Sequence, residues 1–161
     1  MKRHILSILV ENHAGVLSKV TGLFSRRGFN IDSLAVSTTD SDEFSRITIM
    51  VSGDDAIVEQ IKKQVSKLIE VIKINEFTAD EAVSRELVMI KVKANSGNRQ
   101  DIIQIVDIFR AKIVDVSKNT LMIELTGNDE KLTAFEAMLK EYGIVEVVRT
   151  GVIAMERGAH T

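Results

Sequence analysis

The order in which two apolar periodicities alternate along the chain restricts its fold more than any other feature. Apolar residues at every second position predict β-strands, and apolar residues recurring with the period of a helix turn predict helices. In residues 4–77 the order is strand, helix, strand, strand, helix, strand, and the same order returns between residues 87 and 155. The chain is therefore predicted to be α+β, with two ferredoxin-like βαββαβ domains that carry their helices on one face of an antiparallel sheet.

The first unit is predicted to have strands at residues 4–10, 29–38, 45–53 and 70–77. The two helices follow the first and the third of these strands. The apolar stripe of the first helix is Val16, Leu17, Val20, Leu23 and Phe24, and that of the second is Ile57, Ile61, Val65 and Leu68. We expect Gly28 to end the first helix in a left-handed conformation and Asp54 or Asp55 to cap the second.

The second unit follows a polar and acidic stretch that reads as a linker. Its strands are expected at residues 87–94, 112–117, 120–127 and 144–155, the last being one long strand or two short ones. Its helix stripes are Ile102, Ile105, Val106 and Phe109, then Leu132, Phe135 and Leu139, with Asn128 or Asp129 as a cap and Gly143 as a stop. The predicted boundaries are residues 1–78 for the first domain, 79–85 for the linker and 86–161 for the second domain.

Charge and composition exclude several classes of protein. The net charge is −2 with both signs interspersed, which argues against nucleic acid or an anionic membrane as a partner. The sequence has no cysteine, so disulfides and thiolate chemistry are absent. No apolar run approaches the roughly 20 residues that span a bilayer, and the start does not have the pattern of a signal peptide. The sequence thus predicts a cytoplasmic protein with no membrane partner.

The sequence contains no convincing catalytic or metal-binding constellation. Its three histidines, His4, His13 and His160, lack metal-ligand spacing, so no metal site is predicted. His13 is open to two interpretations, a general base or an exposed loop histidine, and no nearby Ser or Asp forms a relay with it. The acidic stretch 40–43 is a solvated loop or a weak cation site. No phosphate-binding glycine motif occurs, and strand 45–51 lacks the aromatics of RNA-recognition modules.

The segment VENHAG, residues 10–15, marks the corner between the first strand and the first helix. One interpretation is a turn with a helix cap, because Asn and Gly are common turn residues. The other is a pocket for a small polar ligand. A helix N-terminus presents unpaired N–H groups to a carboxylate, Gly15 lets a ligand approach them, and Asn12 both donates and accepts hydrogen bonds. Composition alone leaves both interpretations open.

Longer segments resemble one family. ENHAGVLSKVTGLFSRRGFNIDSLAVSTTD, followed by SRITI, is similar to the N-terminal ACT domain of the regulatory (small) subunits of acetolactate synthase, also called acetohydroxyacid synthase. Many ACT domains share the Asn–x–x–Gly–x–Leu corner, whereas GLFSRRGFNIDSL followed by SRITI is a much more specific signature of this family. The similarity continues through RELVMIKV, IFRAKIVDVS, TAFEAML and RTGVIAMERG, essentially the whole chain. Ala14, Lys19 and Asp32 are mild departures that remove no ligand-contacting group.

The resemblance implies a non-catalytic subunit that stimulates a separate large catalytic subunit in valine, leucine and isoleucine biosynthesis. That partner condenses two pyruvates, or pyruvate with 2-oxobutyrate, using thiamine diphosphate, magnesium and FAD, and no cofactor is expected in this chain. The small subunit would confer feedback inhibition, typically by valine. It would form a homodimer through its ACT domains, with the amino acid bound in their interface.

The family's effector-binding residues map onto two stretches of this sequence. By the resemblance, one chain would hold the charged end of valine with Asn12, Gly15, Val16 and Leu17, and His13 and Ala14 line the same loop. The other chain would complete the pocket with Asn30 and Ile31. A stand-alone amino-acid-sensing module that acts on another enzyme or on transcription is the alternative, although no helix-turn-helix or basic segment accompanies the domains. A small enzyme on this fold would need an acid–base pair, and the sequence shows none.

Overall fold

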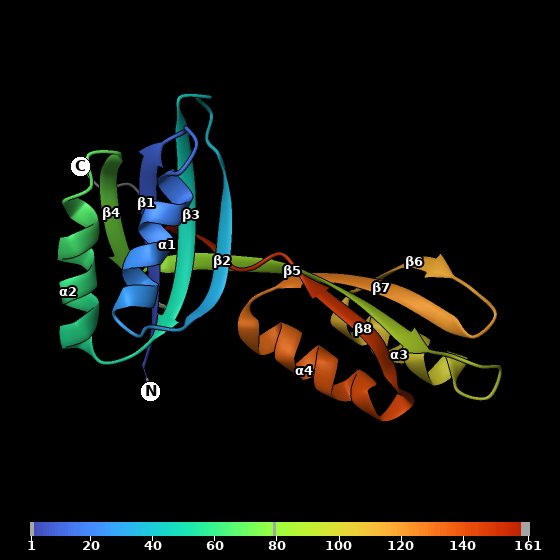
Figure 1. Cartoon of the computed structure of the whole chain (residues 1–161). Coiled ribbons are helices and arrows are strands. Elements are labelled where there is room, and N and C mark those ends of the chain that lie inside the picture. The colour runs from blue at the N-terminus through green and yellow to red at the C-terminus, as the bar shows by residue number, and fades with distance from the viewer. Residues whose placement is uncertain (1, 79, 159–161) are drawn as a thin grey trace. The chain divides into compact units, whose positions relative to one another are not determined.

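The structure is a computed structural model that describes residues 2–78 and 80–158 (Figure 1). Two compact units divide the chain: one contains the described residues up to Val83 together with those from Val152 onward, and the other contains Ser84–Gly151. Each unit has its own cluster of buried apolar side chains. The prediction of two βαββαβ domains is confirmed. In the described part of the chain, no helix is long and apolar enough to span a lipid bilayer.

The first unit is a four-stranded antiparallel sheet in the order β2–β3–β1–β4. Its elements are β1 (Arg3–Glu11), α1 (Val16–Arg26), β2 (Ile31–Thr38), β3 (Phe44–Ser52), α2 (Asp55–Ser66) and β4 (Val71–Phe77). Alternate residues of the two inner strands, such as Ile8 and Ile49, are fully buried against the helices. Successive residues of a strand point to opposite faces, so these alternate buried residues lie on one face of the sheet. Both helices cover that face.

The apolar stripes of α1 and α2 differ in part from those expected. Val16, Val20 and Phe24 of α1 are buried as predicted, but Leu17 is 37% exposed. In α2 the buried residues are Val58, Ile61 and Val65, and Ile57 is 40% exposed. Residues three and four positions before Ile61 both neighbour it on a helix surface, so the spacing alone did not determine which of the two faces the sheet.

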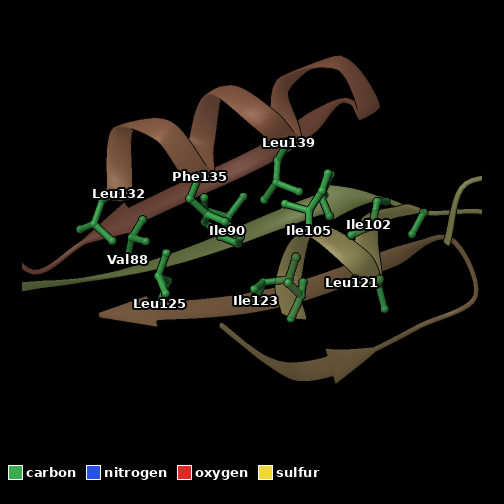
Figure 2. Packing of buried hydrophobic residues seen from close by; sticks show 13 residues of the cluster. Val88, Ile90, Ile102, Ile105, Leu121, Ile123, Leu125, Leu132, Phe135 and Leu139 are labelled. Carbon is green, nitrogen blue, oxygen red and sulfur yellow. The ribbon is translucent and has the colours of Figure 1, made fainter. Parts of the chain in front are cut away.

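The second unit repeats the topology with the strand order β6–β7–β5–β8, and β9 also pairs with β5. Its elements are β5 (Ala82–Lys93), which begins in the first unit, α3 (Arg99–Phe109), β6 (Lys112–Val116), β7 (Thr120–Gly127), α4 (Asp129–Leu139) and β8 (Ile144–Arg149); β9 (Ile153–Glu156) is grouped with the first unit. Leu132, Phe135 and Leu139 of α4 point into the core toward the sheet, as predicted (Figure 2). The ring of Phe109 packs on that of Phe135 with centroids 5.1 Å apart. A 3₁₀ turn at Lys140–Tyr142 ends α4 before Gly143.

The sequence predicted that residues 86–161 form the second domain. In the structure, the described residues from Val152 onward group with the first unit instead. Val152 is 5% exposed, and its N–H donates to Ser33 Oγ at 2.7 Å. Ser33 pairs with Met50 of β3, and both lie on the sheet face opposite the helices. The sequence segment 79–85 also differs from a free linker, because β5 already begins at Ala82.

Candidate functional site

The corner between β1 and α1 is tied to the loop that joins β2 and β3. The backbone N–H of Asn12 donates to the carbonyl of Glu43 at 2.8 Å, and the side-chain Nδ2 donates to the carbonyl of Asp42 at 2.9 Å. Among the described residues no donor bonds the other side-chain atom, Oδ1. Asn12 is exposed, so this oxygen is available to an ammonium group.

The helix that starts at this corner has no side-chain cap. Gly15 is its N-cap residue, at φ 87°, whereas α2 and α4 are capped by Asp54 and Asn128, which accept from Ile57 N–H at 3.2 Å and Lys131 N–H at 2.9 Å. A Cβ built on Gly15 would have nothing within 4 Å, so the space beside the backbone is open. The first N–H groups of a helix lack partners in the helix itself. The N–H of Val16 donates to the carbonyl of His13 at 3.4 Å, so the corner is a turn, but one without the side-chain cap that the turn interpretation expected.

Charged side chains around the corner are paired with one another. Nε2 of His13 lies 2.8 Å from a carboxylate oxygen of Glu11, so His13 is an exposed hydrogen-bond partner of Glu11. Lys19 of α1 pairs with Glu70, just before β4. The hydrogen bond from Lys19 is the main reason that the pKa of Glu70 lies below its ordinary value. These pairs leave the uncapped helix end and Asn12 as the groups available to a ligand.

The second half of the predicted site, Asn30 and Ile31, lies at the opposite end of α1. Ile31 pairs with Val51 near the end of β3, whereas Glu11 pairs with Phe44 at its start. The 11 residues of α1 separate the two ends by about 16 Å. One chain therefore does not bring Asn30 and Ile31 together with the corner around one small ligand. The eight predicted residues form two separate groups in the single chain.

The equivalent corner of the second unit, between β5 and α3, is closed by its own side chains. Asn95 Oδ1 accepts from the N–H groups of Gly97 at 2.8 Å and Asn98 at 3.0 Å, and Asn98 Oδ1 accepts from Asn95 N–H. Arg99 adds hydrogen bonds to the carbonyls of Ser117 and Lys118. α3, like α1, has no side-chain cap, so the two corners differ in the turn before the helix, where Asn95 covers two amides in the second unit.

Other candidate groups are not gathered into a site. The acidic residues of the loop 40–43 form no cluster of metal-ligand type, and the same holds for the rest of the described chain. His160 lies outside the described residues. A shallow hollow between α1 and α2 is lined by Arg27, Gln60, Lys63, Gln64, Ser66 and Lys67, none of which belongs to the predicted site.

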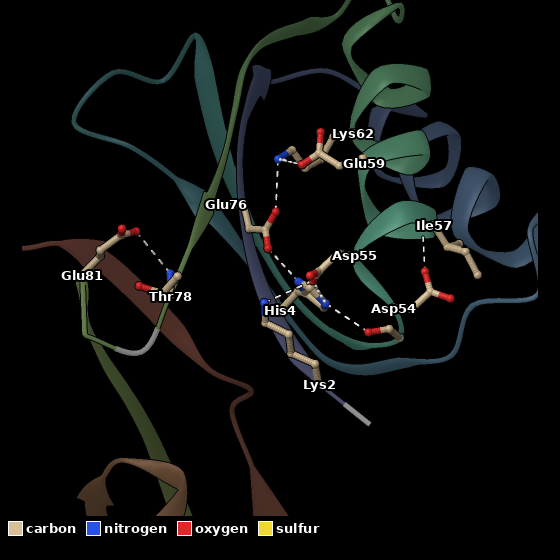
Figure 3. A network of polar contacts seen from close by, with 11 residues as sticks. Lys2, His4, Asp54, Asp55, Ile57, Glu59, Lys62, Glu76, Thr78 and Glu81 are labelled. Atoms are coloured by element: carbon tan, nitrogen blue, oxygen red, sulfur yellow. Dashed lines mark hydrogen bonds and ion pairs between the residues drawn. The ribbon is translucent and has the colours of Figure 1, made fainter.

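A buried polar network at the other end of β1 was missed by sequence reasoning. His4 is 1% exposed, its Nδ1 lies 2.6 Å from Glu76 Oε2, and its Nε2 lies 3.1 Å from the carbonyl oxygen of Gly53 (Figure 3). Asp55 lies 3.6 Å from the same nitrogen. A carboxylate and a carbonyl oxygen only accept, so both ring nitrogens donate in this arrangement. The one available signal was a histidine inside an otherwise apolar strand.

Lys62 extends this network to α2. Its ammonium lies 3.1 Å from Glu76 and 2.6 Å from Glu59. Burial on its own would raise the pKa of Glu76, but the hydrogen bonds from His4 and Lys62 outweigh burial and lower it. The network therefore joins β1, β4 and α2 beside Gly53.

Comparisons with known proteins match both halves of the chain to one family. Residues 6–73 match the model described as "AHAS small subunit-like ACT domain", and residues 85–158 match "Small subunit of acetolactate synthase". The chain is 52% identical to a probable acetolactate synthase small subunit of Archaeoglobus fulgidus over 97% of its length and 98% of the relative's. It is 54% identical to an acetolactate synthase small subunit of Mycolicibacterium smegmatis over 96% of its length and 91% of the relative's.

A solved structure matches the whole fold. The crystal structure of the acetolactate synthase small subunit from Thermotoga maritima superimposes with a TM-score of 0.91 at 43% identity, covering 99% of this chain and 100% of that one. The agreement in fold and sequence extends over both units.

Proposed function

The chain belongs to the family of acetolactate synthase small subunits, and from this membership we propose that it stimulates a separate catalytic large subunit and makes that subunit sensitive to valine. Thiamine diphosphate, magnesium and FAD would then reside in the large subunit, and this chain would carry out no chemistry. We place the assembly in the cytoplasm and the pathway in branched-chain amino acid synthesis. The chain's own part is to bind the effector and transmit its binding.

The uncapped N-terminus of α1 is the observation that carries the effector site. An amino acid offers a carboxylate to the uncapped first turn of α1, where the partial positive charge of a helix end favours an anion. Its ammonium group would donate to Asn12 Oδ1, because an ammonium only donates and Oδ1 is the acceptor of this side chain. His13, Ala14, Val16 and Leu17 would line the same loop.

The separation of the two groups of residues supports a site made by two chains. Asn30 and Ile31 of one chain would close over the corner of its partner, with valine in the interface of a homodimer. A ligand that bridges two chains binds the paired arrangement better than the separated one, and that difference in affinity is what a feedback signal needs. Coupling free energies of this kind are typically about 1–3 kcal/mol.

Reconstitution with the cognate large subunit tests the proposal. We expect no acetolactate from this chain alone, a higher rate when it is added to the large subunit, and inhibition of that added rate on titration with valine. Leucine and isoleucine, titrated in parallel, establish the preferred effector. Stimulation with no response to any of the three would remove the effector site from the proposal. Valine binding with no effect on the large subunit would favour the alternative, a stand-alone amino-acid-sensing module.

A further inference from the structure

Gly53, which joins β3 to α2, is held on three sides. Its N–H donates to the carbonyl of Lys2 at 3.0 Å, and its carbonyl accepts from His4 Nε2 at 3.1 Å. On the third side, a Cβ at position 53 would lie 2.7 Å from Cε1 and 3.0 Å from Cζ of the Phe29 ring. Gly53 has no positive φ, so close approach of the ring is the reason that no side chain fits here.

His4 holds the carbonyl of Gly53 in place and is itself held by other residues. The imidazole is buried and bonded to Glu76 of β4, which Lys62 of α2 also bonds (Figure 3). Any movement of the Gly53 carbonyl would leave a buried N–H of His4 without an acceptor, which is unfavourable. The turn at Gly53 is therefore anchored to two strands and one helix.

Phe29 connects this turn to the second group of the effector site. Its N–H donates to the carbonyl of Phe24 at 3.0 Å, and its ring packs at the edge of the first core. Ile31 pairs with Val51, the same residue that pairs with His4 on the other side of β3. Asn30 is thus the single residue between two anchored neighbours, and its own side chain is exposed.

We propose that Gly53, held by His4, is a positioning residue for the effector. Because Gly53 has no side chain, the Phe29 ring can pack against its Cα. The packed ring then fixes Asn30 and Ile31 in the position from which they contact an effector bound at the partner chain's corner. The inference rests on the proposed valine site and assigns the regulation of that site to residues that do not touch the ligand. A side chain at position 53 pushes the ring outward, and Asn30 moves with it.

A compensating pair of substitutions tests this contact. In full-length protein, Gly53→Ala should weaken valine binding, measured by calorimetry, by about tenfold or more, which corresponds to about 1.4 kcal/mol. The double variant Gly53→Ala with Phe29→Leu removes the ring atoms that the new Cβ meets, and its affinity should return to that of Phe29→Leu alone. Gly127→Ala is the matched control: its Cβ meets only the flexible side chain of Lys131, and valine affinity should not change.

His4→Gln provides a second route, because the glutamine amide carries both of its N–H donors on one nitrogen, whereas the contacts of His4 to Glu76 and to the Gly53 carbonyl come from two different ring nitrogens. We expect weaker valine binding in this variant and unchanged binding in Glu59→Gln, which breaks an outer pair of the same network. Thermal unfolding and stimulation of the large subunit check that each variant is folded.

The outcomes separate the two claims. Wild-type affinity in both Gly53→Ala and His4→Gln, or a double variant that binds valine more weakly than Phe29→Leu alone, overturns the positioning role and leaves the proposed function intact. An unmodified chain that binds no valine removes the valine site from the proposed function, and the positioning role with it.

Discussion

At the scale of single residues, two glycines of the first unit are required for different physical reasons. Gly15 adopts φ 87°, a left-handed conformation that strains other residues, and it faces open space. Gly53 has an ordinary backbone conformation but lies against the Phe29 ring. A substitution at Gly15 therefore acts on the open corner where a ligand would bind, and one at Gly53 acts through a neighbouring side chain.

The effector corner gives the first prediction. Asn12→Ala removes the proposed partner of the valine ammonium group, and Gly15→Asp sets a carboxylate beside the proposed position of the valine carboxylate. Both should abolish valine inhibition of the reconstituted enzyme and largely spare its stimulation. Asn95→Ala, in the closed corner of the second unit, is the control and should leave valine inhibition unchanged. Unaltered valine binding in calorimetry of both corner variants would contradict the assignment of the pocket.

Glu76 gives a prediction on pH. Its folded-state pKa lies below the ordinary 4.5, so the folded state binds this proton less readily than the unfolded state does. The stabilisation is therefore present above the ordinary pKa and is lost as the pH falls through the lower folded value. Urea unfolding should show Glu76→Gln to be less stable than wild type at neutral pH, with the difference shrinking on acidification. The exposed Glu43→Gln serves as the control, and a difference that grows in acid would refute the assignment.

At the scale of elements, periodicity predicted the strands and helices but not everything that covers them. The buried residues of α3 and α4 agree with the predicted stripes: Ile102, Ile105 and Val106, then Leu132, Phe135 and Leu139. In α2, Ile57 and Val58 are adjacent apolar residues, and Val58 is the one that is buried in the core. The predicted effector residues share no helix face or strand, so resemblance to a family was needed to group them. His4 was missed because its partners Gly53 and Glu76 lie far away in the sequence.

The contact of Val152 with the first sheet could not be predicted from the sequence. Val152→Ala removes buried methyl groups beside Ser33, and we expect it to lower the free energy of unfolding of the first unit by about 1–3 kcal/mol. Val148→Ala, at a position that is 54% exposed on β8, should change stability by less than about 0.5 kcal/mol. Chemical unfolding of the three proteins checks this. Equal stabilities of the two variants would contradict the role given to Val152.

At the scale of the whole molecule, the two units have separate cores and only one has an open corner. A ligand that binds the native state raises its unfolding free energy by about 2.7 kcal/mol at 100 times its dissociation constant. Valine should therefore protect backbone amides of the first core, such as those of Ile8 and Ile49, from hydrogen exchange more than those of the second, such as Ile90 and Ile123. Equal protection of both cores would place the effector elsewhere.

The distance between the two groups of effector residues makes valine binding a property of paired chains. Because the corner and Asn30 lie at opposite ends of α1, a single chain does not bring both groups of proposed contacts to one ligand. Binding and pairing are then linked: valine should shift sedimentation of the isolated chain toward the dimer, and its apparent affinity should fall as the protein is diluted into the monomer range. Asn12→Ala should dimerise without responding to valine. Valine binding of equal strength to monomer and dimer would mean that one chain holds the whole site, and Asn30 and Ile31 would then lose their assigned role.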